Sequence, residues 1–150
     1  MPIIATNKKA LHDYQILEKF EAGIVLSGPE VKSVKAGQIN LKGSYISIDS
    51  KSQAWLVDAH IASYKPAASI QTNYQPSQRR KLLLRKKEID YLRGKNKEKG
   101  LTILAISGYT KGSLIKLEIA VAKGKKQYDK RETIKKREID REIRRKLKRW

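Results

Sequence analysis

The chain contains no cysteine, only two histidines and only fifteen acidic residues among 150. The absence of cysteine excludes disulfides and thiolate metal sites, and it suits a reducing cytoplasm. Because His12 and His60 are the only imidazoles, a zinc site would need an unusual carboxylate-rich shell, so we expect no metal. The sequence shows no long apolar run, signal peptide or lipidation motif. We therefore expect a cytoplasmic protein that is not held in a membrane.

Basic residues are abundant: thirty-four Lys and Arg give the chain a formal net charge of +19. A surplus that large repels itself in the compact state, which favours a polyanionic partner. Nucleic acid is the leading candidate and an anionic membrane surface is the alternative. Residues 79–99 carry +7 and residues 123–150 carry +9, which leaves +3 for the rest. Two concentrated patches on a near-neutral body are typical of a nucleic-acid binder.

Alternating apolar residues predict short strands through most of the first 122 residues. Near Gly43 the alternation changes phase, which predicts a bulge or a sharp bend. The segments that alternate with a period of two are 14–22, 55–61, 101–109 and 114–122, the last two joined by a hairpin turn at 110–113.

Two helices are predicted within this body. Ser27 and Glu30 have the spacing of a capping box, and the helix that they begin should end near Gly37. A second helix is predicted over 85–98, after a long surface loop at 62–78. Five or six antiparallel strands with about three short helices predict a mainly β fold, of which the oligonucleotide-binding barrel is the natural example. A ribosomal-protein-like sandwich is the alternative.

After Ala122 the periodicity becomes helical, with Ile139, Ile143 and Leu147 recurring every four residues. A free helix of this length is marginal in water. We therefore divide the chain into a body, 1–122, and a basic tail, 123–150, which should be disordered when free and helical on a partner. A solvated charge run without a partner is the alternative for the tail.

Five sequence blocks, in the same order, resemble the SmpB family (small protein B, the protein partner of transfer-messenger RNA). The similarity runs from about Asn7 to Arg137 and covers nearly the whole chain. The blocks are NKKALHDY from Asn7, FEAGIVLSGPEVKSVKAGQINLKGSY from Phe20, RKLLLRKKEID from Arg80, KGLT from Lys99 and AKGKKQYDKRETIKKRE from Ala122.

The resemblance implies an oligonucleotide-binding-like barrel that binds the tRNA-like domain of transfer-messenger RNA. It further implies delivery of this RNA, with elongation factor Tu, to stalled ribosomes, where the protein substitutes for codon–anticodon pairing. The implied partners are therefore the RNA, the small-subunit ribosomal RNA, and, through the charged RNA, elongation factor Tu and alanyl-tRNA synthetase. The resemblance implies a monomer in the RNA complex, no cofactor and no enzymatic activity.

The matching blocks also imply contacts between the body and the RNA at Asn7, His12, Glu21, Leu83 and Lys116. Lys116 lies on the outward phase of its strand, where an ammonium can pair with phosphate. The Glu21 carboxylate can accept from a base edge that a lysine cannot read, and an ordinary solvated residue is the alternative. For His12 the alternative is an idle surface residue, and for Leu83 it is the core.

For the tail, the resemblance implies contacts in the decoding centre and the mRNA channel. Lysines around Gly124 can approach phosphates closely, and Tyr128 offers a flat face for stacking on a base. The triplet from Asp129 to Arg131 matches one that the family needs for accommodation. Trp150 is either a hydrophobic anchor or simply the last residue. The positions concerned are Lys123, Gly124, Lys125, Lys126, Tyr128, Asp129, Lys130, Arg131 and Trp150.

Two other classes of protein remain in competition with this prediction. A ribosomal or nucleoid protein would share the charge and the tail, but it would bind many RNAs with similar affinity. A ribonuclease could use His12 and His60 as acid and base. These histidines lie on different predicted elements, and no catalytic motif accompanies them. We therefore expect no catalytic site.

Overall fold

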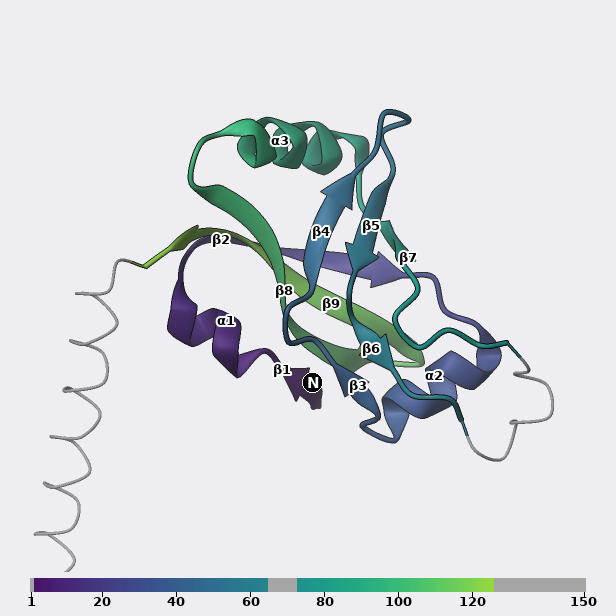
Figure 1. Ribbon diagram of the computed structural model, residues 1–150. Helices are drawn as coiled ribbons and strands as arrows, with labels where there is room; N and C mark the ends of the chain where they lie inside the picture. Colours follow the sequence, from purple (N-terminus) through teal and green to yellow (C-terminus); the bar gives the residue numbers. More distant parts are fainter. Residues whose placement is uncertain (1, 65–72, 126–150) are drawn as a thin grey trace, which may run out of the picture.

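A long antiparallel hairpin forms the centre of the computed structural model, which describes residues 2–64 and 73–125 (Figure 1). Its strands are β8 (Leu101–Lys111) and β9 (Leu114–Gly124). The two strands pair up to Lys111 and Leu114, so Gly112 and Ser113 alone make the turn. Gly112 has a φ of +62°, a conformation that glycine adopts without steric cost and that suits a two-residue hairpin.

A seven-stranded antiparallel sheet is built outward from this hairpin. The strand β2 (Tyr14–Ile24) pairs with β9, and β1 (Ile3–Thr6) pairs with β8. The order is β1-β8-β9-β2-β7-β5-β4, in which β4 is Tyr45–Ile48, β5 is Ala54–Val57 and β7 is Arg80–Leu83. A separate two-stranded ribbon joins β3 (Ile39–Asn40) to β6 (His60–Ile61).

The sheet curls on itself, because β4, at one end of the strand order, lies close to β8. The Asn7 side chain fastens this closure. Its amide nitrogen donates to the carbonyl oxygens of Leu41 and Ala105, both at 3.0 Å. The mainly β class with about three short helices is thus confirmed for the described residues, and the curled sheet has the expected barrel-like form.

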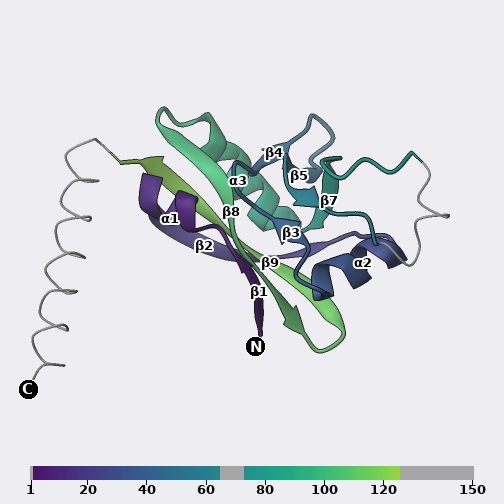
Figure 2. The ribbon, with the colours of Figure 1, turned by 60° about the horizontal axis from the view of Figure 1, so that its bottom comes forward.

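Three helices occur within the described residues: α1 (Lys8–Asp13), α2 (Gly28–Lys35) and α3 (Lys86–Lys97). The predicted capping box of α2 is present, since the Ser27 and Glu30 side chains each accept from the other's backbone N–H. The six-residue helix α1 is too short to show a periodicity in the sequence, and it was not predicted. Figure 2 shows α1 and α2 at opposite ends of the sheet.

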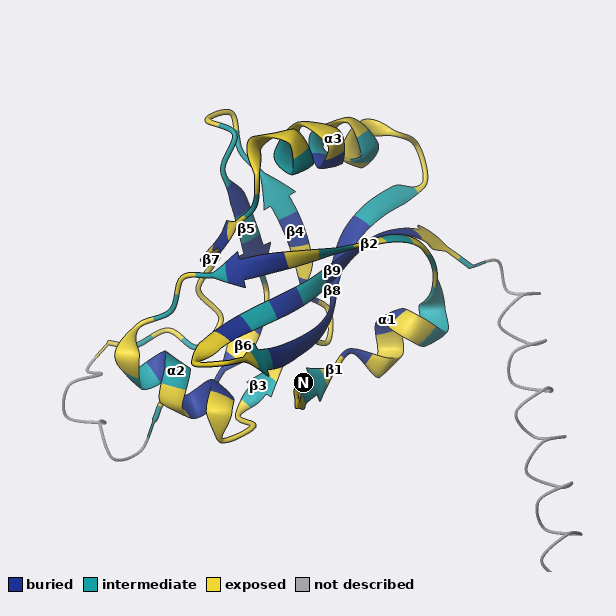
Figure 3. Cartoon of the chain, turned by 180° about the vertical axis from the view of Figure 1, so that it is seen from behind, coloured by how far each residue is buried: buried dark blue, intermediate teal, exposed yellow. Residues whose placement is uncertain are grey.

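The core has three parts. The largest fills the inside of the curled sheet, where α3 contributes Leu92. A second lies between α1 and the other face of β8 and β9, so both faces of the hairpin are buried at this end. The third lies under α2 and contains Val34, Ile61 and Ile115. Figure 3 shows that the outward side of each helix is largely exposed.

The bounds and the number of the strands differ in part from the sequence prediction. The strand predicted over 55–61 is broken at Asp58, whose φ is +62°. As a result β5 ends at Val57 and β6 begins at His60 in the other ribbon. The predicted bend beside Gly43, with a φ of +78°, is confirmed. The described residues form nine strands rather than five or six, because several are only two to four residues long.

Candidate nucleic-acid interface

The register of five neighbouring strands brings distant residues into one row on the outer face of the sheet. Gly23 of β2 pairs with Leu83 of β7 on one side and with Lys116 of β9 on the other. Lys116 in turn pairs with Tyr109 of β8, and Tyr109 with Ile3 of β1. Side chains of directly opposed residues stand on the same face of a sheet. Five chain segments therefore present one continuous surface.

A hollow of about 480 Å³ opens on this surface around Gly23. Of the five body positions predicted to contact RNA, the hollow brings together Glu21, Leu83 and Lys116. It is completed by Leu84, Arg85 and Glu88 from the start of α3 and the segment before it. The hollow, hereafter the Lys116 hollow, thus combines a carboxylate, an apolar side chain and cations, which is what a folded RNA can contact.

Leu83 lies at the surface and not in the core. Its side chain is 55% exposed, whereas its neighbour Leu82 is 2% exposed. The reason is the strand β7, whose residues alternate between the inside and the outside of the sheet. The core alternative for Leu83 is therefore wrong. An exposed leucine beside a lysine is available to contact a partner.

Gly23 allows the close approach of these side chains. A Cβ atom at this position would lie 3.2 Å from the Leu83 Cβ and 3.6 Å from the Lys116 Nζ. The first separation is shorter than ordinary van der Waals contact, so even a methyl group would displace Leu83. Sequence reasoning did not single out Gly23, because its importance depends on the pairing of β2 with both neighbours.

The Glu21 carboxylate is held in place by two hydrogen bonds. The Tyr109 hydroxyl donates to its Oε2, and the Lys111 Nζ donates to its Oε1 at 3.3 Å. These bonds, with the nearby positive charge of Lys116, keep the pKa of Glu21 below its ordinary value. Glu21 is thus an oriented, ionised acceptor on a strongly basic protein. Sequence reasoning did not single out Tyr109 and Lys111, because their contact with Glu21 depends on how β8 pairs with β9 and β9 with β2.

Asn7 and His12 lie at the other end of the same face, on α1 and at its start. Asn7 is 4% exposed, and besides its two amide donations its Oδ1 accepts from the Ala10 N–H at 3.2 Å. In this structure it therefore supports the fold. The His12 Nδ1 lies 2.9 Å from the Asp13 Oδ1, and its side chain is 32% exposed. The structure does not bring these two residues to the Lys116 hollow.

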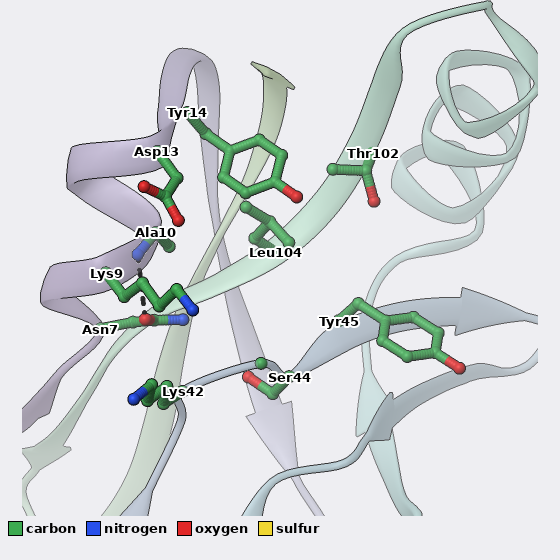
Figure 4. Close-up of a pocket in the computed structure, with 11 residues that line it drawn as sticks. Asn7, Lys9, Ala10, Asp13, Tyr14, Lys42, Ser44, Tyr45, Thr102 and Leu104 are labelled. Atoms are coloured by element: carbon green, nitrogen blue, oxygen red, sulfur yellow. Dashed lines mark hydrogen bonds between the residues drawn. The ribbon is translucent and has the colours of Figure 1, made fainter. Parts of the chain in front are cut away.

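A second hollow, of about 600 Å³, lies beside α1 (Figure 4). Lys9 and Lys42 stand on one side of it, and Tyr14 and Tyr45 also contribute to its lining. Asn7 forms part of its floor. Asn7 is therefore next to a cationic and aromatic surface, whereas His12 does not line this hollow. The RNA contacts predicted for both residues stay predictions.

The beginning of the predicted tail belongs to the sheet. Lys123 and Gly124 are the last residues of β9 and pair with Gln15 and Tyr14. The Lys125 N–H donates to the Asp13 carbonyl at 2.9 Å, which ties this residue to the end of α1. The other tail positions, Lys126, Tyr128, Asp129, Lys130, Arg131 and Trp150, lie outside the described residues.

The basic segment 79–99 is not uniformly available to a partner. The side chain of Arg80 is only 2% exposed and pairs with Glu30 at 2.8 Å. The Arg79 guanidinium stacks over the ring of Trp55, 4.0 Å from its centroid. Most lysines of α3 are exposed, which leaves a cationic surface beside the Lys116 hollow.

The residues that the structure describes do not indicate a metal site, a catalytic pair of histidines or a membrane-spanning helix. Within 2–64 and 73–125, no three His, Asp or Glu side chains are grouped so that they could hold a metal. His12 and His60 are on separate elements, α1 and β6, with His60 exposed beside α2. None of the described helices is both long and apolar enough to cross a membrane.

Comparison with known proteins gives consistent matches over almost the whole chain. The family model described as SmpB protein matches residues 4–149. The SsrA-binding protein of Sulfurihydrogenibium sp. (strain YO3AOP1) is 55% identical over 141 residues, which cover 94% of this chain and 91% of the relative. That of Persephonella marina (strain DSM 14350 / EX-H1) is 50% identical over 146 residues, covering 97% and 94%.

A solved structure is also similar. The chain aligns with a TM-score of 0.69 and 38% identity to one from the work "tmRNA-SmpB: a journey to the center of the bacterial ribosome". The alignment covers 85% of this chain and 87% of the other. Sequence and fold therefore agree on one group of relatives.

Proposed function

This chain belongs to the SmpB family, and on that premise we propose that it binds transfer-messenger RNA in the rescue of stalled ribosomes. Its relatives are named SsrA-binding proteins, and the similar solved structure concerns SmpB with this RNA at the ribosome. The net charge of +19 supports a polyanionic partner. The protein acts as a binding module in the cytoplasm and not as an enzyme.

The observation that carries the proposal is the convergence of Glu21, Leu83 and Lys116 in one hollow. These residues come from three strands and from sequence positions up to 95 apart, yet they share one surface. Lys116 pairs with a phosphate of the tRNA-like domain and sets the position of the backbone. Leu83 contacts the apolar face of a sugar or base, and Glu21 accepts from a base edge.

The residues at α1 serve the same RNA from the other end of the sheet. Asn7 holds α1 and the closure of the sheet through its three side-chain hydrogen bonds. His12 is half-buried at the last turn of α1, where its ring can bond to sugar or phosphate. We expect an indirect effect for Asn7 and a direct one for His12.

The tail performs the separate task at the ribosome. Because the Lys125 N–H is hydrogen-bonded to the Asp13 carbonyl, the chain leaves the body at a defined place beside α1. From there residues 126–150 enter the decoding centre and the empty mRNA channel, where the small-subunit ribosomal RNA is their partner. Elongation factor Tu and alanyl-tRNA synthetase are reached through the charged RNA, and one copy of the protein binds each RNA.

The experiment that tests the function is competition binding at physiological salt. Labelled transfer-messenger RNA is bound by the purified protein and challenged with an excess of bulk tRNA. A clear preference for transfer-messenger RNA supports the proposal. Equal competition would contradict it, and the chain would then be a general RNA-binding ribosomal protein.

A further inference from the structure

Glu21 stands between two hollows, of which the second has no assigned role. This hollow, of about 440 Å³, is lined by Ile3, Lys19, Phe20, Glu21, Ser107, Tyr109 and Glu118. We call it the Tyr109 hollow. It shares Glu21 with the Lys116 hollow, so one carboxylate faces both. A nucleotide whose phosphate lies on Lys116 could therefore place its base on the Tyr109 side.

The walls of the Tyr109 hollow differ from those of a phosphate site. Ile3, at its edge, is 66% exposed, which is unusual for a large apolar side chain without a partner. Glu118 supplies a second carboxylate, which lies 3.5 Å from the Lys19 Nζ. Two carboxylates repel a phosphate but accept hydrogen bonds, since an ionised carboxylate has only acceptors. The hollow therefore suits a base that presents donors.

The Tyr109 side chain fixes the carboxylate that such a base would meet. Tyr109 is only 9% exposed, and its backbone is paired on both sides, with Ile3 and with Lys116. Its ring therefore has little freedom, and its hydroxyl donates to Glu21. Burial, followed by the hydrogen bond to Glu21, raises the pKa of Tyr109, so the hydroxyl keeps its proton over the whole physiological range.

We propose that Tyr109 is a positioning residue for RNA recognition: it holds the Glu21 carboxylate toward an unpaired purine base that enters the Tyr109 hollow. The base that fits is guanine, whose Watson–Crick edge carries an imino and an amino donor side by side. A carboxylate with both oxygens on one side accepts from these two donors together. The inference rests on the proposed function and names the chemical group that gives it selectivity.

Tyr91 provides a matched control. Its hydroxyl also donates to a glutamate, Glu18, although Tyr91 is 41% exposed whereas Tyr109 is buried. The pair connects α3 to β2 and lines neither the Lys116 hollow nor the Tyr109 hollow. Tyr109→Phe and Tyr91→Phe therefore remove the same atom from the same kind of bond, one inside the proposed site and one outside it.

The test measures binding of the full chain to transfer-messenger RNA in which single guanines are replaced by inosine, which lacks the amino donor. With the wild-type protein we expect at least one inosine position to weaken binding. Tyr109→Phe should weaken binding to the unmodified RNA by about tenfold, as expected for a lost hydrogen bond to a charged group. Tyr109→Phe should also reduce the loss of affinity that this inosine causes, and Glu21→Ala should abolish that loss. Tyr91→Phe should change neither quantity.

A second readout separates positioning from a structural effect. Without the Tyr109 hydroxyl, Glu21 is protonated more readily, so the loss of binding on acidification should begin at a higher pH in Tyr109→Phe than in the wild type. The salt dependence should stay the same, because no phosphate contact is removed. Glu21→Ala gives the same information about the inosine position even if Tyr109→Phe folds poorly.

Several outcomes would overturn the inference. One is a protein that prefers transfer-messenger RNA but shows no inosine position that depends on Glu21. Another is that Tyr109→Phe changes neither the affinity nor the pH at which binding is lost on acidification. An equal loss in Tyr109→Phe and Tyr91→Phe would show a general loss of stability. By contrast, a wild-type protein without any preference for transfer-messenger RNA would contradict the proposed function itself.

Discussion

The Glu30 carboxylate and the Arg80 guanidinium form an ion pair of 2.8 Å in the interior, where their side chains are only 4% and 2% exposed. Arg80 also donates to the carbonyls of Ala59 and Pro76, both at 2.8 Å. Glu30 in addition accepts from the hydroxyl of Tyr74. The pair therefore ties α2 and β7 to each other, to Ala59 before β6, and to the segment that contains Tyr74 and Pro76.

Removing one partner of this pair should strongly destabilise the protein. In Glu30→Gln the guanidinium of Arg80 stays buried without a counter-charge, which costs about 3–5 kcal/mol. The exposed pair of Lys95 and Glu98, at 3.3 Å, is the control, since Glu98→Gln should cost less than about 1 kcal/mol. Urea unfolding followed by circular dichroism measures both. Similar small losses in the two variants would show that the buried pair does not hold α2 in place.

The same pair should make stability depend on pH in the acid range. Burial raises the pKa of Glu30, but the Ser27 N–H and Arg80 outweigh it, so the pKa is lowered overall. A carboxyl whose pKa is lower in the folded state stabilises the protein above its unfolded pKa of about 4.3. This stabilisation is lost as the pH falls through the lower, folded value. The stability difference between the wild type and Glu30→Gln should thus be constant above about pH 5.5 and shrink below about pH 4. A difference that does not change with pH would refute this.

Gly23→Ala should weaken RNA binding without unfolding the protein. The new methyl group would press on Leu83 and approach Lys116, which shifts two of the proposed RNA contacts. We expect a loss of about fivefold in affinity, equivalent to about 1 kcal/mol. Gly94→Ala is the control, because a Cβ there meets open space on α3 and should slightly stabilise the helix. If both variants bind alike, Leu83 and Lys116 do not form one contact surface.

The affinity for transfer-messenger RNA should fall steeply with salt, on the order of a hundredfold or more between about 50 and 200 mM. Lys116→Met should lower the slope of log affinity against log salt by about 1, since one phosphate contact is lost. Lys51, at the exposed turn between β4 and β5, is the control, and Lys51→Met should leave the slope unchanged. A flat salt response of the wild type would contradict a polyanionic partner.

Removal of residues 126–150 should spare RNA binding and abolish ribosome rescue. The cut is placed after Lys125 because β9 ends at Gly124 and the Lys125 N–H is hydrogen-bonded to the Asp13 carbonyl. Binding to the isolated RNA and peptide tagging on stalled ribosomes are measured with the same preparation. Loss of RNA binding on truncation would show that body and tail do not have separate tasks.

The parts of this site that sequence could predict are those that follow from a local repeat. The period of two placed Glu21 and Lys116 on the outside of their strands, and both positions are confirmed. The capping box placed Glu30 at the start of α2, but not in a buried ion pair. The hydrogen bond that Oε1 of its carboxylate accepts from Ser27 follows from the local capping box. The hydrogen bond that Oε2 accepts comes from Arg80, fifty residues away.

The remaining parts depend on which strands become neighbours. Tyr109 reaches Glu21 only because the hairpin turn has two residues, which sets the pairing of β8 with β9. Gly23 matters only because β7 and β9 flank it. Asn7 is polar and would be expected at the surface, but carbonyls 34 and 98 residues away satisfy its amide in the interior. No local pattern contains this information.

Site-specific crosslinking tests most directly whether the tRNA-like domain occupies the Lys116 hollow. A photoreactive phenylalanine analogue replaces Leu83, which is 55% exposed at the hollow, or, as a control, Lys51 at the turn between β4 and β5, which does not line the hollow. The purified protein is irradiated with transfer-messenger RNA, and the crosslinked nucleotides are mapped. We predict efficient crosslinks from position 83 to the tRNA-like domain and few from position 51. Equal crosslinking from both positions, or crosslinks from 83 only to other parts of the RNA, would contradict the proposed interface.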